Sequence, residues 1–259
     1  MNILQCGIGA IGKKLFPEFE AMARATGGDI SIYDPPVQKR QGATDEMIEK
    51  ILWQHYDIAF LCVPTEKKKS GECDVSILLE VAEKVSRTAD VVVIKSTFPV
   101  TAVKKLPANC IYSPEFSSTT VHGGEQNFVI LGGNRKLCNK VAELYKRTRP
   151  ADFRICYTDI RTAIMAKYTL NTFLALKVTY FNEIAQCCSE CGVEYDDVRN
   201  LVLMDSRISP SHTWVYGGQP YYDSHCFNKD VPAFNFVFHS PLMAEVERIN
   251  SEMKRKTGK

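Results

Sequence analysis

The chain has 259 residues, enough for one substantial core and a smaller second module. Hydrophobic residues make up 45% and charged residues 24%, the balance of an ordinary globular protein, so wholesale disorder is excluded. A net charge of +2 lacks the concentrated basic surface that nucleic acid requires, and no segment approaches the roughly 20 apolar residues that span a bilayer. We therefore expect no nucleic-acid partner and no membrane insertion.

Ten cysteines are scattered along the chain, and no cationic leader with an apolar core precedes the first strand-like run. This pattern favours reduced thiols in a cytoplasmic protein. Cys187, Cys188 and Cys191 lie close together, but no second pair at ligand spacing accompanies them. We expect these three side chains to pack in the core, and we predict no bound metal.

Short apolar runs alternate with longer helix-like segments through the first 155 residues. This rhythm predicts an α/β fold, a Rossmann-type doubly wound parallel sheet with helices on both faces. The predicted strands lie at residues 3–6, 30–33, 58–63, 91–95, 110–113 and 128–132. Pro17 falls inside the first predicted helix, which we expect it to kink or shorten because proline has no backbone N–H.

The pattern changes from about Asp159 onward, where the strand-like runs stop. Residues 162–191 contain neither Pro nor Gly and are followed by Gly192, which predicts one long helix. A shorter helix is predicted at 196–204, and an irregular stretch follows at 206–224. We predict two domains: a Rossmann domain at 1–157, and a long connecting helix with a small all-helical domain at 158–259.

A glycine-rich turn, Gly7-Ile8-Gly9-Ala10-Ile11-Gly12, follows the first predicted strand and opens a helix. In dinucleotide-binding folds the first Gly permits the tight turn, the second lets backbone amides approach the pyrophosphate, and the third brings helix and strand close together. Asp34 closes the second strand, 22 residues after Gly12, where its carboxylate would bind the ribose hydroxyls and repel a 2′-phosphate. We predict a site for NAD rather than NADP, with contacts from Gly7, Gly9, Ile11, Gly12 and Asp34.

Five further motifs follow in order along the chain. They are Val63-Pro64-Thr65, Lys95-Ser96-Thr97, Ser113-Pro114-Glu115-Phe116, Lys167-Tyr168-Thr169-Leu170-Asn171 and Cys226-Phe227-Asn228-Lys229-Asp230. Together with Asn182-Glu183-Ile184-Ala185-Gln186 in the long helix, they resemble the UDP-glucose/GDP-mannose dehydrogenase family. The resemblance extends from Ile3 to about Phe234.

This resemblance implies an NAD-dependent oxidoreductase that converts the primary alcohol of a nucleotide sugar to a carboxylate, reducing two NAD. Cys226 would be the nucleophile that carries the thiohemiacetal and the thioester. Lys167 and Asn171, four residues apart on a helix, would stabilise the oxyanion and position a water. Asp230 would orient that water or Lys167, and Glu115 would be the general base for thioester hydrolysis.

The resemblance also implies cofactor contacts beyond the glycine turn. Thr97, at the end of a strand, would touch the nicotinamide half of NAD. The other residues implied are Val63, Pro64, Thr65 and Ser96. The implied partners are a nucleotide-sugar substrate and a second copy of the chain, joined as a homodimer through the long helix.

The chain departs from the family pattern in three places. Residues 221–225 replace the end of the family's glycine-rich loop, so the sugar pocket is expected to differ. Thr119 stands where the family has a second acidic residue, which would slow hydrolysis or leave it to Glu115 alone. Only 29 residues follow Asp230, where the family continues with a further α/β domain. We therefore expect a short form, with a smaller or differently held substrate, a partner that supplies the missing surface, or no turnover.

Two alternatives remain open from the sequence. β-Hydroxyacid dehydrogenases share the Rossmann domain, the long helix and a Lys-xxx-Asn pair, and they perform one two-electron oxidation without a cysteine. The other alternative is a non-catalytic protein that retains NAD binding only.

Overall fold

A computed structural model describes residues 1–116 and 126–258, which form two compact units. Unit 1 contains residues 1–66, 74–116 and 126–167. Unit 2 contains residues 67–73 and 168–258 of the described chain.

Unit 1 is built on a seven-stranded sheet with the strand order β2-β1-β3-β4-β5-β6-β7. The strands are β1 (Ile3–Cys6), β2 (Ile30–Tyr33), β3 (Tyr56–Leu61), β4 (Ala89–Ile94), β5 (Cys110–Tyr112), β6 (Phe128–Gly132) and β7 (Arg154–Thr158). All neighbours pair in parallel except β5 and β6, which pair antiparallel at Tyr112 and Gly132. The order reverses between β1 and β3, which is where doubly wound sheets bind ligands. The predicted Rossmann-type fold is confirmed, with one antiparallel pair added.

The strand limits agree closely with the sequence patterns, but the prediction missed β7. Its sequence begins with a charged residue, Arg154, and its burial alternates between exposed and half-buried positions. An edge strand of this kind lacks the continuous apolar run that marked the buried strands β3 and β4. The run was too exposed and too polar to be recognised.

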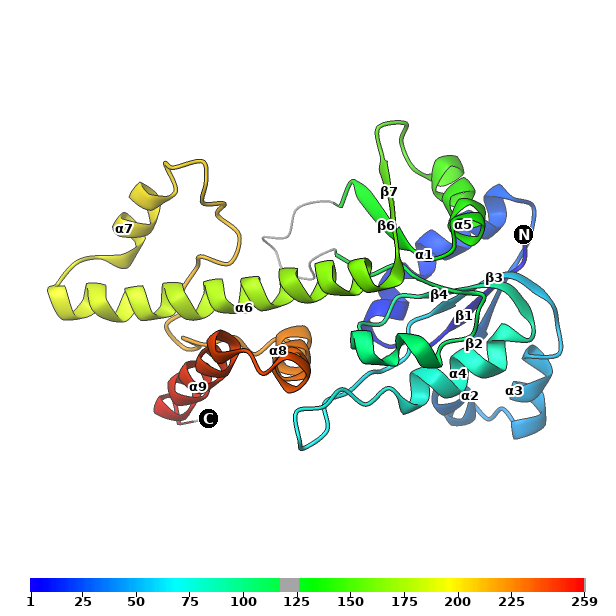
Figure 1. Cartoon of the computed structure of the whole chain (residues 1–259), viewed down its shortest axis with the longest axis horizontal. Helices are drawn as coiled ribbons and strands as arrows, with labels where there is room; N and C mark the ends of the chain where they lie inside the picture. Colours follow the sequence, from blue (N-terminus) through cyan, green and yellow to red (C-terminus); the bar gives the residue numbers. More distant parts are fainter. Residues whose placement is uncertain (117–125, 259) are drawn as a thin grey trace. The chain divides into compact units, whose positions relative to one another are not determined.

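Helices cover both faces of this sheet (Figure 1). One face carries α1 (Ala10–Ala25) and α5 (Arg135–Thr148), and the other carries α2 (Pro35–Arg40), α3 (Asp45–Ile51) and α4 (Ser76–Ser86). A short 3-10 helix, η1 (Val100–Lys105), follows β4.

The helix α1 continues through Pro17, so the expectation that this residue shortens the helix is wrong. Pro17 is exposed, while the buried face of α1 packs on the sheet. Phe19 stacks on Phe60 of β3 with ring centroids 3.9 Å apart, in a core that includes side chains of α5. Packing of this face holds the helix together despite the missing hydrogen bond.

Unit 2 is mainly helical. The long helix α6 (Ile160–Cys191) starts in unit 1 and continues through unit 2, beginning two residues before the predicted 162. It is followed by α7 (Tyr195–Val202), α8 (His225–Phe238) and α9 (Pro241–Lys256). The core of unit 2 is formed by side chains of α6, α8 and α9 and by the loop before α8: Ala175, Tyr222, Phe227, Val231, Met243 and Val246.

The stretch at 203–224, between α7 and α8, is irregular as predicted, and polar side chains fasten it to the helices. Lys177 Nζ of α6 donates to the Ser209 carbonyl at 2.6 Å. Asn250 of α9 both donates to the Tyr222 carbonyl, at 3.1 Å, and accepts from its N–H, at 2.8 Å. The two bonds to Tyr222 fix the chain immediately before α8 begins.

No disulfide joins any of the ten cysteines, all of which lie in the described part of the chain. Cys188 is buried, but Cys187 and Cys191 are exposed, so the expected core packing is wrong for these two. Successive residues of a helix point about 100° apart, so only one side of this last part of α6 can face the core. Among residues 1–116 and 126–258, no three His, Cys, Asp or Glu side chains gather as metal ligands.

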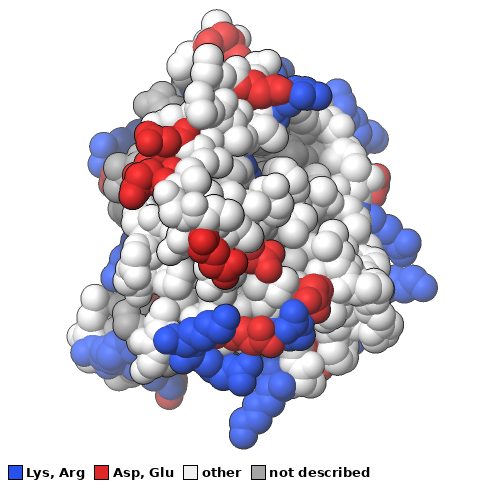
Figure 2. Space-filling model, turned by 90° about the vertical axis from the view of Figure 1, so that its left-hand side faces the viewer, with Lys and Arg blue, Asp and Glu red and all other residues white. Residues whose placement is uncertain are grey.

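The described helices include none with both the length and the apolar character needed to cross a membrane. Acidic and basic side chains are intermixed on the face shown in Figure 2, and uncharged side chains fill most of its middle. Several large apolar side chains of unit 2 are exposed, among them Leu201 and Met204 at 68% and 81%. Exposed apolar groups on this scale often mark contact surfaces.

Candidate active site

The glycine turn after β1 is shaped by two close backbone approaches. Gly7 has φ +89°, and a Cβ on it would lie 2.5 Å from the Cys62 carbonyl oxygen. A Cβ on Gly12 would lie 2.1 Å from the Gly7 carbonyl oxygen. Both positions therefore require glycine. The buried side chain of Gln5 donates from Nε2 to the carbonyls of Gly7 and Gly12, at 3.1 and 2.8 Å, which fastens the turn to β1.

The amino end of α1 fits a dinucleotide. Gly9 caps this helix without any side-chain hydrogen bond, and a Cβ on it would meet no heavy atom within 4 Å. The backbone N–H groups at the start of a helix attract phosphate, and the space above Gly9 leaves them accessible. Ile11 packs partly buried against the core of unit 1. The residues present therefore fit the pyrophosphate of NAD.

Asp34 lies against the same turn. Its Oδ2 accepts a hydrogen bond from the Ile8 N–H at 2.8 Å, and its Oδ1 accepts one from Val37 at 3.1 Å, at the start of α2. A carboxylate has about four acceptor positions, so two remain for ribose hydroxyls. The structure thus brings together the glycine turn and the acidic residue predicted from the sequence.

The loops after β3 and β4 are joined by side-chain hydrogen bonds. Thr65 Oγ1 donates to the Thr97 carbonyl at 2.7 Å, and Ser96 Oγ donates to the Val63 carbonyl at 2.6 Å. Pro64 between them is exposed. Because β1, β3 and β4 are parallel, these loops lie at the same edge of the sheet as the glycine turn.

A buried ion pair lies at the ends of β4 and β5. Lys95 Nζ lies 3.5 Å from Glu115 Oε2 and 3.5 Å from Ser113 Oγ. Burial lowers the pKa of Lys95, but the electrostatic effects of Tyr145, Glu115, Glu18 and Cys62 together outweigh burial, so the pKa is raised overall. No role was predicted for Lys95. The sequence signal that could have identified it is its position, because Lys95 directly follows the apolar run of β4.

Lys167 is the last residue of unit 1, and Asn171 lies one turn further along α6, in unit 2. Lys167 is buried, and its Nζ lies 5.1 Å from the ring centroid of Phe116, at a distance where cation–π attraction operates. Phe116 follows Glu115 directly, so Lys167 and the Glu115 segment adjoin within unit 1.

Asp230 of α8 is the centre of a buried polar cluster in unit 2. This side chain is 1% exposed, its Oδ2 accepts from Asn171 Nδ2 at 2.6 Å, and its Oδ1 lies 2.6 Å from Lys229 Nζ. Burial lowers the pKa of Lys229, but the Asp230 carboxylate and the thiols of Cys73 and Cys226 outweigh it, so the pKa is raised. We expected Asp230 to orient a water or Lys167; within unit 2 its cationic partner is Lys229, which was given no role.

Cys226 lies in the first turn of α8, where Ser224 caps the helix by accepting from the Phe227 N–H at 3.1 Å. Its side chain is half-buried. Residues four apart on a helix share a face, so Cys226 and Asp230 project from the same side of α8. Thr119, which stands where the family has a second acidic residue, lies outside the described residues.

Two family models match the chain. Residues 37–148 match the NAD binding domain, and residues 161–252 match the central domain, of the UDP-glucose/GDP-mannose dehydrogenase family. A UDP-glucose 6-dehydrogenase from Bacillus subtilis is 29% identical over 227 residues, covering 76% of this chain and 49% of the relative. The chain spans about half the length of the curated relatives that it matches first.

Solved structures show the same fold. A UDP-glucose dehydrogenase from Pyrobaculum islandicum matches with a TM-score of 0.77 at 21% identity, covering 98% of this chain and 68% of that one. A 3-hydroxyisobutyrate dehydrogenase from Mycobacterium tuberculosis matches with a TM-score of 0.68 at 16% identity, covering 97% and 92%.

Proposed function

The chain belongs to the UDP-glucose/GDP-mannose dehydrogenase family, and on that premise we propose that it oxidises the primary alcohol of a nucleotide sugar to a carboxylate. The proposed substrate is a UDP-glucose-like sugar, since the curated relatives carry that specificity in their names. NAD supplies the oxidant, accepting two electrons at each of two oxidations. The amino end of α1 would hold its pyrophosphate, and Asp34 its ribose.

We assign the covalent step to Cys226. Its sulfur bonds to the aldehyde carbon formed by the first oxidation, the carbonyl π bond opens, and the thiol proton passes to the former carbonyl oxygen, so that a thiohemiacetal results. The second oxidation leaves a thioester on the same sulfur. Water then adds to the carbonyl carbon, the carbon–sulfur bond breaks, and the thiol and the carboxylate product are released.

The other assigned residues act on the charges that this sequence creates. Lys167 supplies positive charge to the oxyanion, and Asn171 supplies a hydrogen bond. Glu115 takes the proton of the attacking water, and Asp230 orients that water. Support comes mainly from one observation: Asp230 shares a helix face with Cys226 and is held by Asn171 and Lys229 in a buried cluster. A carboxylate fixed in this way is suited to positioning a water beside the thioester.

The test is the stoichiometry of the purified protein. With UDP-glucose and excess NAD we expect two NADH for each sugar consumed and accumulation of the acid. Cys226→Ser should abolish acid formation, whereas Cys187→Ser, at an exposed thiol, should leave it unchanged. A wild-type ratio of one NADH per sugar would rule out the thioester route, and NAD binding without turnover of any nucleotide sugar would favour a non-catalytic protein.

A two-electron β-hydroxyacid dehydrogenase is the second candidate. It is considered because a 3-hydroxyisobutyrate dehydrogenase has the same fold over 97% of this chain. Such an enzyme needs no cysteine. Oxidation of a small β-hydroxyacid that survives Cys226→Ser would establish it.

We also propose a homodimer through α6. Phe173 and Tyr180 lie seven residues apart, on one side of this helix, and are 56% and 53% exposed. Burial of two such rings against a second copy would stabilise an interface. Sedimentation should give a dimer for the wild type and a monomer for Phe173→Asp combined with Tyr180→Asp. A monomeric wild type would contradict the proposal.

A further inference from the structure

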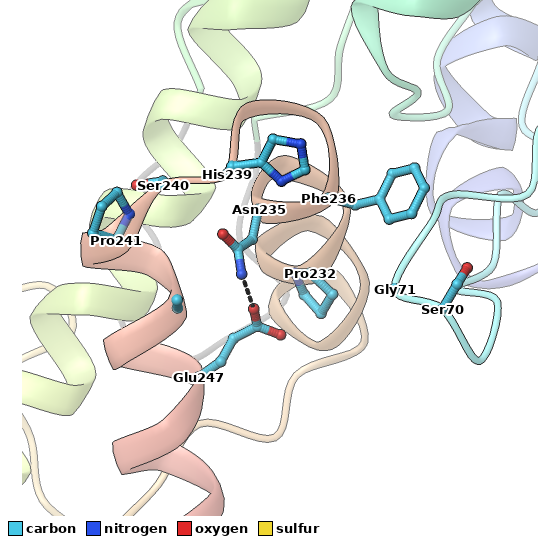
Figure 3. A pocket seen from close by; sticks show the side chains of 10 residues that line it. Ser70, Gly71, Pro232, Asn235, Phe236, His239, Ser240, Pro241 and Glu247 are labelled. Atoms are coloured by element: carbon cyan, nitrogen blue, oxygen red, sulfur yellow. Dashed lines mark hydrogen bonds between the residues drawn. The ribbon is translucent and has the colours of Figure 1, made fainter.

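A pocket of about 400 Å³ opens in unit 2 where α8 is followed by α9 (Figure 3). Its volume lies in the range of small-ligand sites. Asn235 and Glu247 face each other across the two helices in Figure 3, and Phe236 points toward the loop that holds Ser70 and Gly71. All of these residues belong to unit 2.

The pocket is separate from the cluster around Cys226 and Asp230. At about 100° per residue, Pro232 and Asn235 project from the side of α8 roughly opposite to those two, and neither Cys226 nor Asp230 lines the pocket. A ligand in the pocket would therefore not touch the groups assigned to the dehydrogenase reaction.

Glu247 gives the pocket its charge. This carboxylate is half-buried, and its Oε2 accepts a hydrogen bond from Asn235 Nδ2 at 3.1 Å. Burial raises the pKa of Glu247, and the opposing effects of Asn235 and Lys67 do not cancel the rise. Within residues 1–116 and 126–258 no cation lies within 4 Å of it, so the charge of Lys67 acts from beyond ion-pair distance. The carboxylate is thus only partly compensated for its loss of water.

The remaining walls suit the carbon body of a ligand. Phe236 is 44% exposed, so its ring face is available for cation–π contact. Pro232, Pro241 and Ala244 add apolar surface. The carboxyl end of α8 and the amino end of α9 meet here, and their opposite partial charges offset one another. Glu247 is the one acidic side chain among the described residues that line the pocket, and His239 is the other titratable one.

We propose that this pocket binds a small organic ammonium ion, with the ammonium group on Glu247 and Asn235 and the aliphatic part against Phe236 and the prolines. An ammonium compensates a desolvated carboxylate by charge as well as by hydrogen bonds, which a neutral hydroxyl cannot do. The proposal is independent of the dehydrogenase assignment.

The experiment titrates the full chain with n-butylammonium chloride near neutral pH at constant ionic strength. Binding is followed by the amide signals of Asn235 and its neighbours in ¹H–¹⁵N spectra. Butan-1-ol, a neutral molecule of the same length, is the matched ligand. We expect saturable shifts with butylammonium, and binding of butanol at least about tenfold weaker. No saturable shift, or equal binding of both molecules, would overturn the proposal.

Three variants test whether butylammonium binds in this pocket. Glu247→Gln should weaken butylammonium binding about tenfold, and Phe236→Leu, at an exposed position, should weaken it severalfold. Glu245→Gln is the control, because it removes the same charge from an exposed pair with Arg248 on the same helix. Equal weakening by Glu245→Gln and Glu247→Gln would attribute binding to the general surface charge and refute the pocket. A thermal melt of each variant checks that it folds.

Discussion

At the scale of single residues, the Asp230 cluster combines a structural and a chemical role. Asp230 is almost fully buried and Lys229 is 12% exposed at its side chain, so neither charge is well solvated. A buried pair adds little net stability, but removal of one partner leaves the other charge without compensation. The same contacts that hold Asp230 beside Cys226 therefore make it hard to replace.

We predict that Asp230→Asn lowers the free energy of unfolding by about 3 kcal/mol, because the Lys229 ammonium would remain buried without its carboxylate. Urea unfolding monitored by circular dichroism measures the change. Glu245→Gln, which breaks an exposed pair, should cost less than about 1 kcal/mol. Equal losses in the two variants would show that the Asp230 pair is effectively solvated.

The residues that sequence analysis missed at this scale are lysines. Lys95 and Lys229 both lie within the family-like motifs, yet neither was predicted to have a role. A lysine is usually solvated, and only the fold shows that Glu115 and Asp230 lie beside these two. The partner of a buried charge lies on another element, and the spacing along the chain does not reveal it.

At the scale of elements, the glycines of the turn have two different functions, although the sequence presents them as one motif. Gly12 is needed for packing, since its Cβ would collide with the backbone of Gly7, whereas Gly9 faces open space. Gly12 is therefore required by the fold, whereas Gly9 is required by a ligand.

Gly12→Ala and Gly9→Ala should accordingly fail in different ways. We predict that Gly12→Ala lowers the free energy of unfolding by about 1–3 kcal/mol because α1 must shift. Gly9→Ala should leave stability within about 1 kcal/mol of wild type but weaken NAD binding at least about tenfold, because its methyl group occupies the space above the helix end. Unfolding curves and NAD titration by calorimetry measure the two effects. Unchanged NAD affinity in Gly9→Ala would place the pyrophosphate elsewhere.

Pro17 provides a prediction about α1 itself. The helix runs through this exposed residue, so it tolerates a missing hydrogen bond that alanine would restore. Pro17→Ala should raise the free energy of unfolding by about 1–3 kcal/mol. Chemical denaturation gives the value, and a loss of stability would show that the proline ring makes a contact that the helix needs.

The strands were predicted well where burial on both faces produced continuous apolar runs, as in β3 and β4. β7 was missed because its alternating exposure resembles that of a loop. The helices α8 and α9 were predicted only as part of a helical domain. Pro232 inside α8 argues against a helix on local preference alone, and packing against Ala175 and Met243 overrides that preference.

At the scale of the whole molecule, the stability of the chain should depend on pH through thiols buried in the sheet of unit 1. Burial raises the pKa of Cys62 and of Cys110 from the ordinary value of 9.0 to about 12, and it raises the pKa of Cys6 as well. Folding therefore favours the protonated thiols. Their contribution to stability is fully present below the unfolded pKa and is lost as the pH rises toward the folded values.

We predict that the free energy of unfolding of the wild type falls steeply between about pH 8 and about pH 10, with each buried thiol contributing about 1.4 kcal/mol of the loss. Cys110→Ala cannot ionise at this position, so the difference between the two pH values should shrink by that amount, even if the variant is less stable overall. Cys156→Ala, at an exposed thiol, is the matched control and should retain the wild-type difference. Urea unfolding at both pH values under reducing conditions measures all three proteins. An unchanged pH dependence in Cys110→Ala would mean that this thiol ionises as readily in the folded chain as in the unfolded one, and that the sheet opens at this position.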